Sequence, residues 1–208
     1  MRCPYGPDGL EEQDLAPTWL GQLTGWLQDA VREGVPEPNA MVLATADAEG
    51  TPGARTVLLK GLDERGLAFY TNLRSRKGRE LDQNPCASAV LLWLPLQRQV
   101  RVDGRVEEVD AGEADAYFAS RPHGSKLAAA ASPQSEVIES RGALDRLHAE
   151  FERRHPDGSA VVRPPWWGGR RLVPSSVEFW QGRQNRLHDR LRYRREDSAN
   201  WVLERLAP

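Results

Sequence analysis

The feature that most constrains the fold is a series of short strand-like segments separated by hairpin-type turns. The segments cover residues 40–46, 54–59, 67–70, 87–93 and 99–109, with two more at 172–179 and 187–195 and a short one near 201–206. Turn residues such as Asp47, Gly50 and Pro52 stand between neighbouring segments. Short strands at this close spacing favour an antiparallel barrel or sandwich over a parallel sheet.

Helical patterns interrupt these strands. From Thr18 the apolar residues recur with helical spacing until Gly34 provides a stop, and further helices are predicted at 75–82, 113–120 and 141–153. Residues 164–169 form a predicted loop with two tryptophans, and residues 1–16, which are polar and rich in proline and glycine, a mobile N-terminal arm. We therefore predict an α+β fold, an antiparallel barrel with peripheral helices, as one domain over residues 17–208.

The composition excludes several classes of protein. The chain has 208 residues, of which 39% are hydrophobic and 28% charged, and its formal net charge of -2 favours neither nucleic acid nor an anionic membrane as a partner. Its two cysteines, Cys3 and Cys86, form neither a disulfide framework nor a metal-ligand spacing, so we expect no metal and a cytoplasmic setting. No apolar run is long enough to span a bilayer.

One candidate phosphate site follows the predicted strand that ends at Tyr70, where Thr71 opens a polar loop. Ser75 can cap the next helix, and Arg76 and Lys77 lie in its first turn, where cations oppose the helix dipole. An anion bound by the backbone N–H groups and the two cations relieves this conflict. The alternative is a solvated helix face, and we favour the phosphate site.

A second candidate cradle combines Tyr117, Arg121 and Ser125. Tyr117 and Arg121 are four residues apart on a predicted helix and share a face. Pro122 and Gly124 then turn the chain, so that the hydroxyl of Ser125 can return to the same place. On spacing alone, a helix C-terminus with Arg121 bound to the last carbonyl groups explains the pattern equally well.

Isolated polar residues on strands and loops are further candidates. Arg55 and Lys60 bracket an apolar segment, but strict alternation puts them on opposite faces, and charged strand ends explain them as well. Gln99 lies on a strand that otherwise carries valines, and Gln134 and Ser135 offer amide and hydroxyl groups in a loop.

The segment 180–190 carries the remaining candidates. If it is extended, Arg186, His188 and Arg190 share one face, with Leu187 and Asp189 on the other. Two guanidinium groups that flank an imidazole can form the wall of an anion-binding site, whereas the alternative is a solvated edge strand protected against aggregation.

Together these motifs resemble the pyridoxamine 5′-phosphate oxidase family over residues 39–208. The matching segments, in chain order, are RTVLLK (55–60), FYTN (69–72), SRK (75–77), RQV (98–100), YF with SRP (117–122), QS (134–135), VEFWQG (177–182), RLHDR (186–190) and ERLAP (204–208). The resemblance implies an FMN-binding split barrel that forms a homodimer with flavin held between the subunits.

The resemblance also implies roles for individual residues. The residues that would contact FMN are Arg55, Tyr70, Thr71, Arg76, Lys77, Gln99, Gln134, Ser135, Trp180 and Arg190. The residues that would hold the substrate phosphate are Lys60, Tyr117, Arg121 and Ser125. Arg186 and His188 would lie over the pyridine ring as catalytic residues, with the larger role for Arg186.

The implied reaction oxidises pyridoxamine or pyridoxine 5′-phosphate to pyridoxal 5′-phosphate with O₂ as acceptor, and releases H₂O₂ and, from the amine, ammonia. Residues 126–132 depart from the family, which usually has glycine and tryptophan there, while Arg2 and Tyr5 align with an arm that closes over substrate. Two alternatives remain: a related biosynthetic flavin oxidase with another aromatic substrate, and a non-catalytic carrier of FMN or pyridoxal phosphate.

Overall fold

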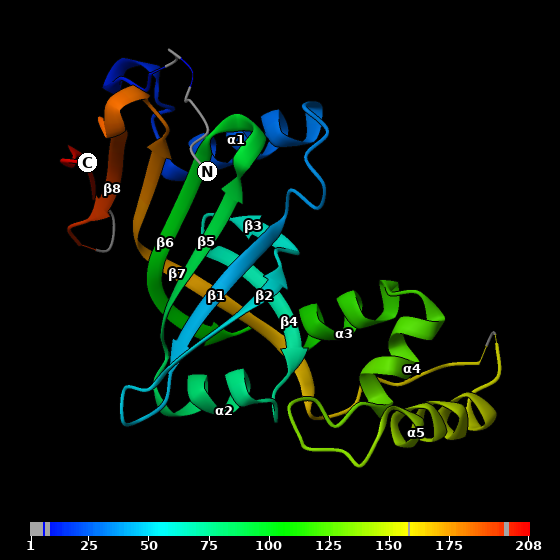
Figure 1. The fold of residues 1–208 in the computed structure, drawn as a ribbon. Helices are drawn as coiled ribbons and strands as arrows, with labels where there is room; N and C mark the ends of the chain where they lie inside the picture. The colour runs from blue at the N-terminus through cyan, green and yellow to red at the C-terminus, as the bar shows by residue number, and fades with distance from the viewer. Residues whose placement is uncertain (1–5, 7–8, 158, 198–199) are drawn as a thin grey trace.

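The structure, a computed structural model, describes residues 6, 9–157, 159–197 and 200–208. A curled antiparallel sheet forms its body (Figure 1), in the order β2-β1-β5-β6-β7-β4-β3, with β8 paired to β7 and β9 to β8. The strands are β1 (Ala40–Ala46), β2 (Pro52–Leu58), β3 (Gly61–Asp63), β4 (Gly66–Asn72), β5 (Cys86–Trp93), β6 (Arg98–Glu108), β7 (Trp167–Gln181), β8 (Asp189–Arg195) and β9 (Trp201–Arg205). The predicted α+β split-barrel architecture is confirmed.

The helices lie around this sheet. They are α1 (Trp19–Arg32), α2 (Arg76–Gln83), α3 (Ala111–Ser120), α4 (His123–Ala131) and α5 (Arg141–Arg154). In Figure 1, α3, α4 and α5 gather at one end of the sheet, whereas β8 lies at the other. None of the helices in the described part of the chain is long and apolar enough to cross a membrane.

The hydrophobic core lies between α1 and the concave face of the sheet. α1 begins after Thr18, whose hydroxyl accepts a hydrogen bond from the Gly21 N–H, and it buries Leu23 and Trp26. Trp26 packs edge-on against Phe179 of β7, with ring centroids 5.1 Å apart. Alternating apolar residues of β6 and β7 complete this core, so their polar residues face outward.

The long strand β7 connects the two ends of the molecule. Its first half pairs with β4, its second half pairs with β8, and β6 pairs along almost all of it, with an irregularity beside Gly104. At Gly169 a Cβ atom would meet Val109 and Tyr70 at 2.7–2.8 Å, so only glycine permits the close approach of β7 to these residues. The segment predicted as a loop at 164–169 therefore becomes strand from Trp167 onward.

Two other local predictions were wrong. Pro122 lies between α3 and α4, at the N-cap of α4, but Gly124 does not turn the chain, because it lies inside that helix. The strand predicted at 187–195 begins only at Asp189, since Asn185 and Arg186 adopt left-handed backbone angles, with φ of 56° and 63°. Arg186 therefore lies in a short 3₁₀ turn (Gln184–Arg186) and does not share a strand face with Arg190.

Candidate functional site

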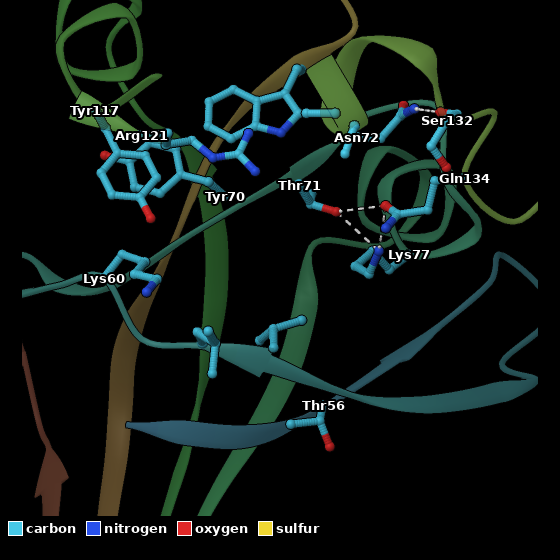
Figure 2. A pocket seen from close by; sticks show the side chains of 15 residues that line it. Thr56, Lys60, Tyr70, Thr71, Asn72, Lys77, Tyr117, Arg121, Ser132 and Gln134 are labelled. Atoms are coloured by element: carbon cyan, nitrogen blue, oxygen red, sulfur yellow. Dashed lines mark hydrogen bonds between the residues drawn. The ribbon is translucent and has the colours of Figure 1, made fainter. Parts of the chain in front are cut away.

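A cavity of about 460 Å³ lies between the α3–α4 pair and the strands β2 and β4 (Figure 2). It is lined by Thr56, Val57, Leu58, Lys60, Tyr70, Thr71, Asn72, Lys77, Tyr117, Arg121, Ala128, Ala129, Ser132, Gln134 and Trp167. Among these described residues are three cations and no carboxylate. The cavity is therefore suited to an anion.

Lys77 lies in the first turn of α2 and points into one side of this cavity (Figure 2). Its Nζ donates hydrogen bonds to Thr71 Oγ1 at 2.9 Å, Ser75 Oγ at 3.1 Å and Gln134 Oε1 at 3.1 Å. Burial and, second, the nearby positive charge of Arg55 lower the pKa of Lys77 to about 8. An anion beside Lys77 would relieve the cost of its buried charge.

An aromatic stack forms the other side of the cavity. The ring of Tyr70 stacks on that of Tyr117 at 3.9 Å, and Trp167 lies nearly parallel to both, at 5.5 and 6.2 Å between centroids. The guanidinium of Arg121 lies 4.9 Å from the centre of the Trp167 ring. Its Nη1 is buried with no hydrogen-bond partner among the described residues, and burial lowers the pKa of Arg121.

Arg55 and Arg76 do not line the cavity, although both lie beside it. They converge on Glu80 of α2, which is only 4% exposed: Arg55 Nη2 lies 2.9 Å and Arg76 Nε 2.6 Å from its oxygens. The hydroxyl of Thr45 donates to the same carboxylate. Burial acts to raise the pKa of Glu80, but the hydrogen bonds from Thr45, Arg76 and Arg55 lower it, so the cluster keeps its ion pairs at neutral pH.

A second group of predicted residues lies on the outer face of β6, β7 and β8. Gln99 pairs across the sheet with Trp180, and Trp180 pairs with Arg190. The ring of His188 lies 4.6 Å from that of Trp180, and its Nδ1 accepts a hydrogen bond from the Arg183 N–H. This row of side chains is ordered by strand register.

Within one chain the two groups lie far apart. Trp167 and Trp180 are thirteen residues apart on β7, which at about 3.3 Å per residue corresponds to roughly 43 Å along the strand. In Figure 1, the end of β7 near α3 and α4 and the end near β8 lie on opposite sides of the molecule. A single small ligand can touch both groups only if a second subunit contributes one of them.

The structure thus brings together some of the predicted residues and not others. The cavity contains Lys60, Tyr70, Thr71, Lys77, Tyr117, Arg121 and Gln134. Ser125 and Ser135 do not line it, although Ser125 lies one turn before Ala128 and Ala129, which do. Arg186 is exposed on its 3₁₀ turn.

Sequence reasoning assigned no role to several residues of the cavity, among them Thr56, Asn72 and Trp167. A signal for Trp167 existed, since a large aromatic residue before two glycines suits a strand start that other side chains approach closely. Of the proposed arm, Arg2 and Tyr5 lie outside the described residues. Leu10 is buried, and its N–H donates to Asp189 of β8 at 3.0 Å. The described residues include no group of histidine, cysteine or acidic side chains that could hold a metal ion.

Comparisons with known proteins are consistent with this arrangement. Residues 27–152 match the family model for pyridoxamine 5′-phosphate oxidase, and residues 167–208 match the model for the pyridoxine 5′-phosphate oxidase C-terminal dimerisation region. The chain is 56% identical over 211 residues to pyridoxine/pyridoxamine 5′-phosphate oxidase from Frankia alni, covering 100% of this chain and 88% of the relative. It is 54% identical to the protein of that name from Salinispora arenicola, covering 100% and 95%.

Solved structures have the same fold. PhzG from Burkholderia lata, in complex with tetrahydrophenazine-1-carboxylic acid, superimposes with a TM-score of 0.89 at 34% identity, covering 97% of this chain and 99% of that one. A pyridoxamine 5′-phosphate oxidase-related, FMN-binding protein from Nostoc punctiforme superimposes with a TM-score of 0.73 at 25% identity, covering 94% and 100%. The similarity extends over almost all of the chain.

Proposed function

The chain belongs to the pyridoxamine 5′-phosphate oxidase family of FMN-dependent oxidases, and on that premise we propose that it oxidises pyridoxamine or pyridoxine 5′-phosphate to pyridoxal 5′-phosphate. The observation that carries this proposal is the cavity with three cations and no carboxylate among its described residues. It contains an arginine with a buried nitrogen that has no partner among those residues. A phosphate group would satisfy this nitrogen.

The residues present fit FMN. Lys77, Thr71 and Gln134 form one hydrogen-bonded group whose buried amine needs a counter-ion, and Arg55 and Arg76 lie beside it. We propose that this group holds the FMN phosphate, with Tyr70 and Ser135 as further contacts. The flavin ring would lie against Gln99, Trp180 and Arg190.

The substrate phosphate would bind on the other side of the cavity. Arg121 offers its unpaired Nη1, and Lys60 and the hydroxyl of Tyr117 line the same space. The role of Ser125 as a phosphate ligand stays a prediction. It is supported by the position of Ser125 on the same face of α4 as Ala128 and Ala129. A phosphate held away from the reacting carbon orients the substrate without taking part in the chemistry.

Two residues would act at the pyridine ring. Bound FMN supplies a hydride acceptor that O₂ reoxidises with release of H₂O₂, and the imine product from the amine substrate is hydrolysed to give ammonia. Arg186 would stabilise the negative charge that develops on the substrate, and His188 would hold it by a hydrogen bond. Both belong to the outer row and its adjoining turn, not to the cavity of the same chain.

The active site would therefore be built from two subunits. The family's C-terminal dimerisation region covers residues 167–208, which indicates a homodimer. The separation of roughly 43 Å along β7 supports a site in which one chain provides the cavity and its partner provides Gln99, Trp180, Arg186, His188 and Arg190. The single domain over residues 17–208 and the cytoplasmic setting stay predictions.

The test is an anaerobic titration of the purified flavoprotein with pyridoxine 5′-phosphate. Bleaching of the flavin absorbance, reversed by air with formation of pyridoxal 5′-phosphate, is the expected result. A flavin that binds but stays oxidised would contradict the substrate assignment. It would favour the second candidate, an oxidase of another aromatic anion, which the likeness to PhzG supports. A carrier that binds FMN or pyridoxal phosphate without turnover would give the same spectrum, but its flavin would not be reduced by another aromatic anion either.

A further inference from the structure

Trp167 occupies a central position beneath the cavity. Its side chain is only 5% exposed, and it contacts Tyr70 and Tyr117 by stacking and Phe118 edge-on, with the Phe118 centroid at 4.9 Å. Its carbonyl oxygen accepts a hydrogen bond of 2.7 Å from Arg163. Trp167 is thus fixed at the point where β7 meets α3.

The contact between Trp167 and Arg121 differs from those of the other arginines near the proposed sites. Arg55 and Arg76 share the carboxylate of Glu80, and Arg190 is bound by Glu178. Arg121 instead lies over aromatic rings, 4.9 Å from the centre of Trp167 and 5.7 Å from that of Phe118. A ring face stabilises a cation without using its N–H groups.

This difference matters for binding an anion. A carboxylate partner competes with phosphate for the N–H donors of a guanidinium, whereas an indole ring leaves all of them available. Consistently, the Nη1 of Arg121 is buried and has no partner among the described residues. The charged residues that line the cavity with Arg121 are the cations Lys60 and Lys77.

Trp167 also fixes Tyr117, the second proposed ligand of the substrate phosphate. The rings of Trp167 and Tyr117 are inclined by only 4°, and Tyr70 stacks on both of them. Rings held in this way lose few orientations when a ligand binds, so the Tyr117 hydroxyl and the Arg121 guanidinium keep their positions relative to each other.

We propose that Trp167 is a positioning residue for the substrate phosphate: it holds Arg121 and Tyr117 by its ring face and leaves their donors free for the anion. The inference rests on the proposed function, whose substrate carries a phosphate. It adds a residue that acts on the substrate phosphate through Arg121 and Tyr117.

The experiment compares Trp167→Leu, Trp167→Phe and wild type in steady-state assays at saturating FMN, with pyridoxine 5′-phosphate and with unphosphorylated pyridoxine. We expect Trp167→Leu to raise the KM for the phosphorylated substrate about tenfold with kcat within about threefold, and Trp167→Phe to raise it about threefold. The inhibition constant of inorganic phosphate should rise in parallel. The value of kcat/KM for pyridoxine should stay within about twofold of wild type, because pyridoxine carries no phosphate and makes no contact that the substitution could weaken.

Trp166→Leu is the matched control. Trp166 precedes Trp167 and lies over Arg74, at 5.1 Å, but it does not line the cavity. We expect the Trp166→Leu substitution to leave the KM for pyridoxine 5′-phosphate unchanged. An equal loss of kcat/KM for both substrates in Trp167→Leu would indicate a structural role only and overturn the inference. If that variant does not fold, an unchanged KM in Trp167→Phe would overturn it.

Failure of the proposed function would be visible separately. A wild-type enzyme that does not oxidise pyridoxine 5′-phosphate would contradict that function while the inference is still testable. Calorimetric titration of the FMN-loaded proteins with inorganic phosphate would then decide. An affinity about tenfold weaker in Trp167→Leu would support the positioning role, and equal affinities would overturn it.

Discussion

Arg190 on β8 is bound by Glu178 on the neighbouring strand β7 through two hydrogen bonds, of 2.8 Å from Nε and 3.1 Å from Nη2. Glu178 is only 3% exposed and also forms an ion pair with Arg101, at 3.0 Å. The Nη1 of Arg190 donates a hydrogen bond to the carbonyl oxygen of Ala207. The ion pair with Glu178 raises the pKa of Arg190, so its charge is permanent. The guanidinium proposed to contact FMN thus has a fixed orientation.

We predict that Glu178→Gln weakens FMN binding by roughly tenfold, because a neutral amide holds the guanidinium of Arg190 less firmly. Fluorescence titration of the FMN-free protein with FMN would measure this. Glu204→Gln is the control, since Glu204 of β9 binds Arg192 and Arg194 in the same way but does not contact Arg190. Equal FMN affinity in Glu178→Gln and wild type would refute the role of Glu178.

The affinity for FMN should decrease as the pH rises above about 8. The pKa of Lys77 is lowered to about 8 in the FMN-free protein, so the lysine is charged below this pH and neutral above it. A bound phosphate favours the charged form, and each pH unit above 8 should weaken binding by up to about tenfold. Equilibrium titrations between pH 7 and 9.5 would test this.

Lys77→Arg should give a nearly flat profile over the same range, because arginine keeps its charge. A wild-type affinity that does not change between these pH values would show that Lys77 does not hold the phosphate.

A mixture of two inactive variants should regain activity if each site uses both subunits. Lys77→Ala alters the cavity and Arg190→Ala alters the outer row, so a heterodimer of the two contains one intact site. Random exchange should restore about a quarter of the wild-type activity. Co-expression with two different tags allows the heterodimer to be purified, and with one intact site of two it should have about half of the wild-type activity. A mixture that stays inactive would place both groups in a site within one chain.

Arg186→Ala should lower turnover of pyridoxine 5′-phosphate by at least tenfold while FMN affinity changes by less than about threefold. Arg186 is exposed on its 3₁₀ turn, away from the hydrogen-bonded group of Lys77, Thr71 and Gln134. Its loss should therefore not disturb the proposed phosphate contacts of FMN. Stopped-flow reduction of the flavin and an FMN titration would separate the two effects. Equal losses in both would contradict this division of roles.

Most of the sheet could be predicted from the sequence. The expected strand at 40–46 coincides with β1, and the alternation of apolar and polar residues placed β6 and the second half of β7 nearly correctly. These segments succeed because each has one buried face, and a period of two follows directly from strand geometry. The local signal failed at α4, which was not predicted. Gly124 suggested a turn but lies inside this helix, and Pro122 occupies its N-cap, where a proline is tolerated.

The site was harder to predict for a physical reason. The sequence alone determined the chemical types, namely the cations, hydroxyl groups and aromatic rings in their motifs, because residue type fixes charge and hydrogen-bonding capacity. Only the tertiary structure decided which of them meet. The pairing of β7 with β4 places Trp167 beneath Arg121. The left-handed backbone of Asn185 and Arg186 keeps Arg186 out of β8 and so out of the predicted row with His188 and Arg190. Such contacts depend on strand register and on backbone angles far from the motifs, and local sequence patterns do not encode either.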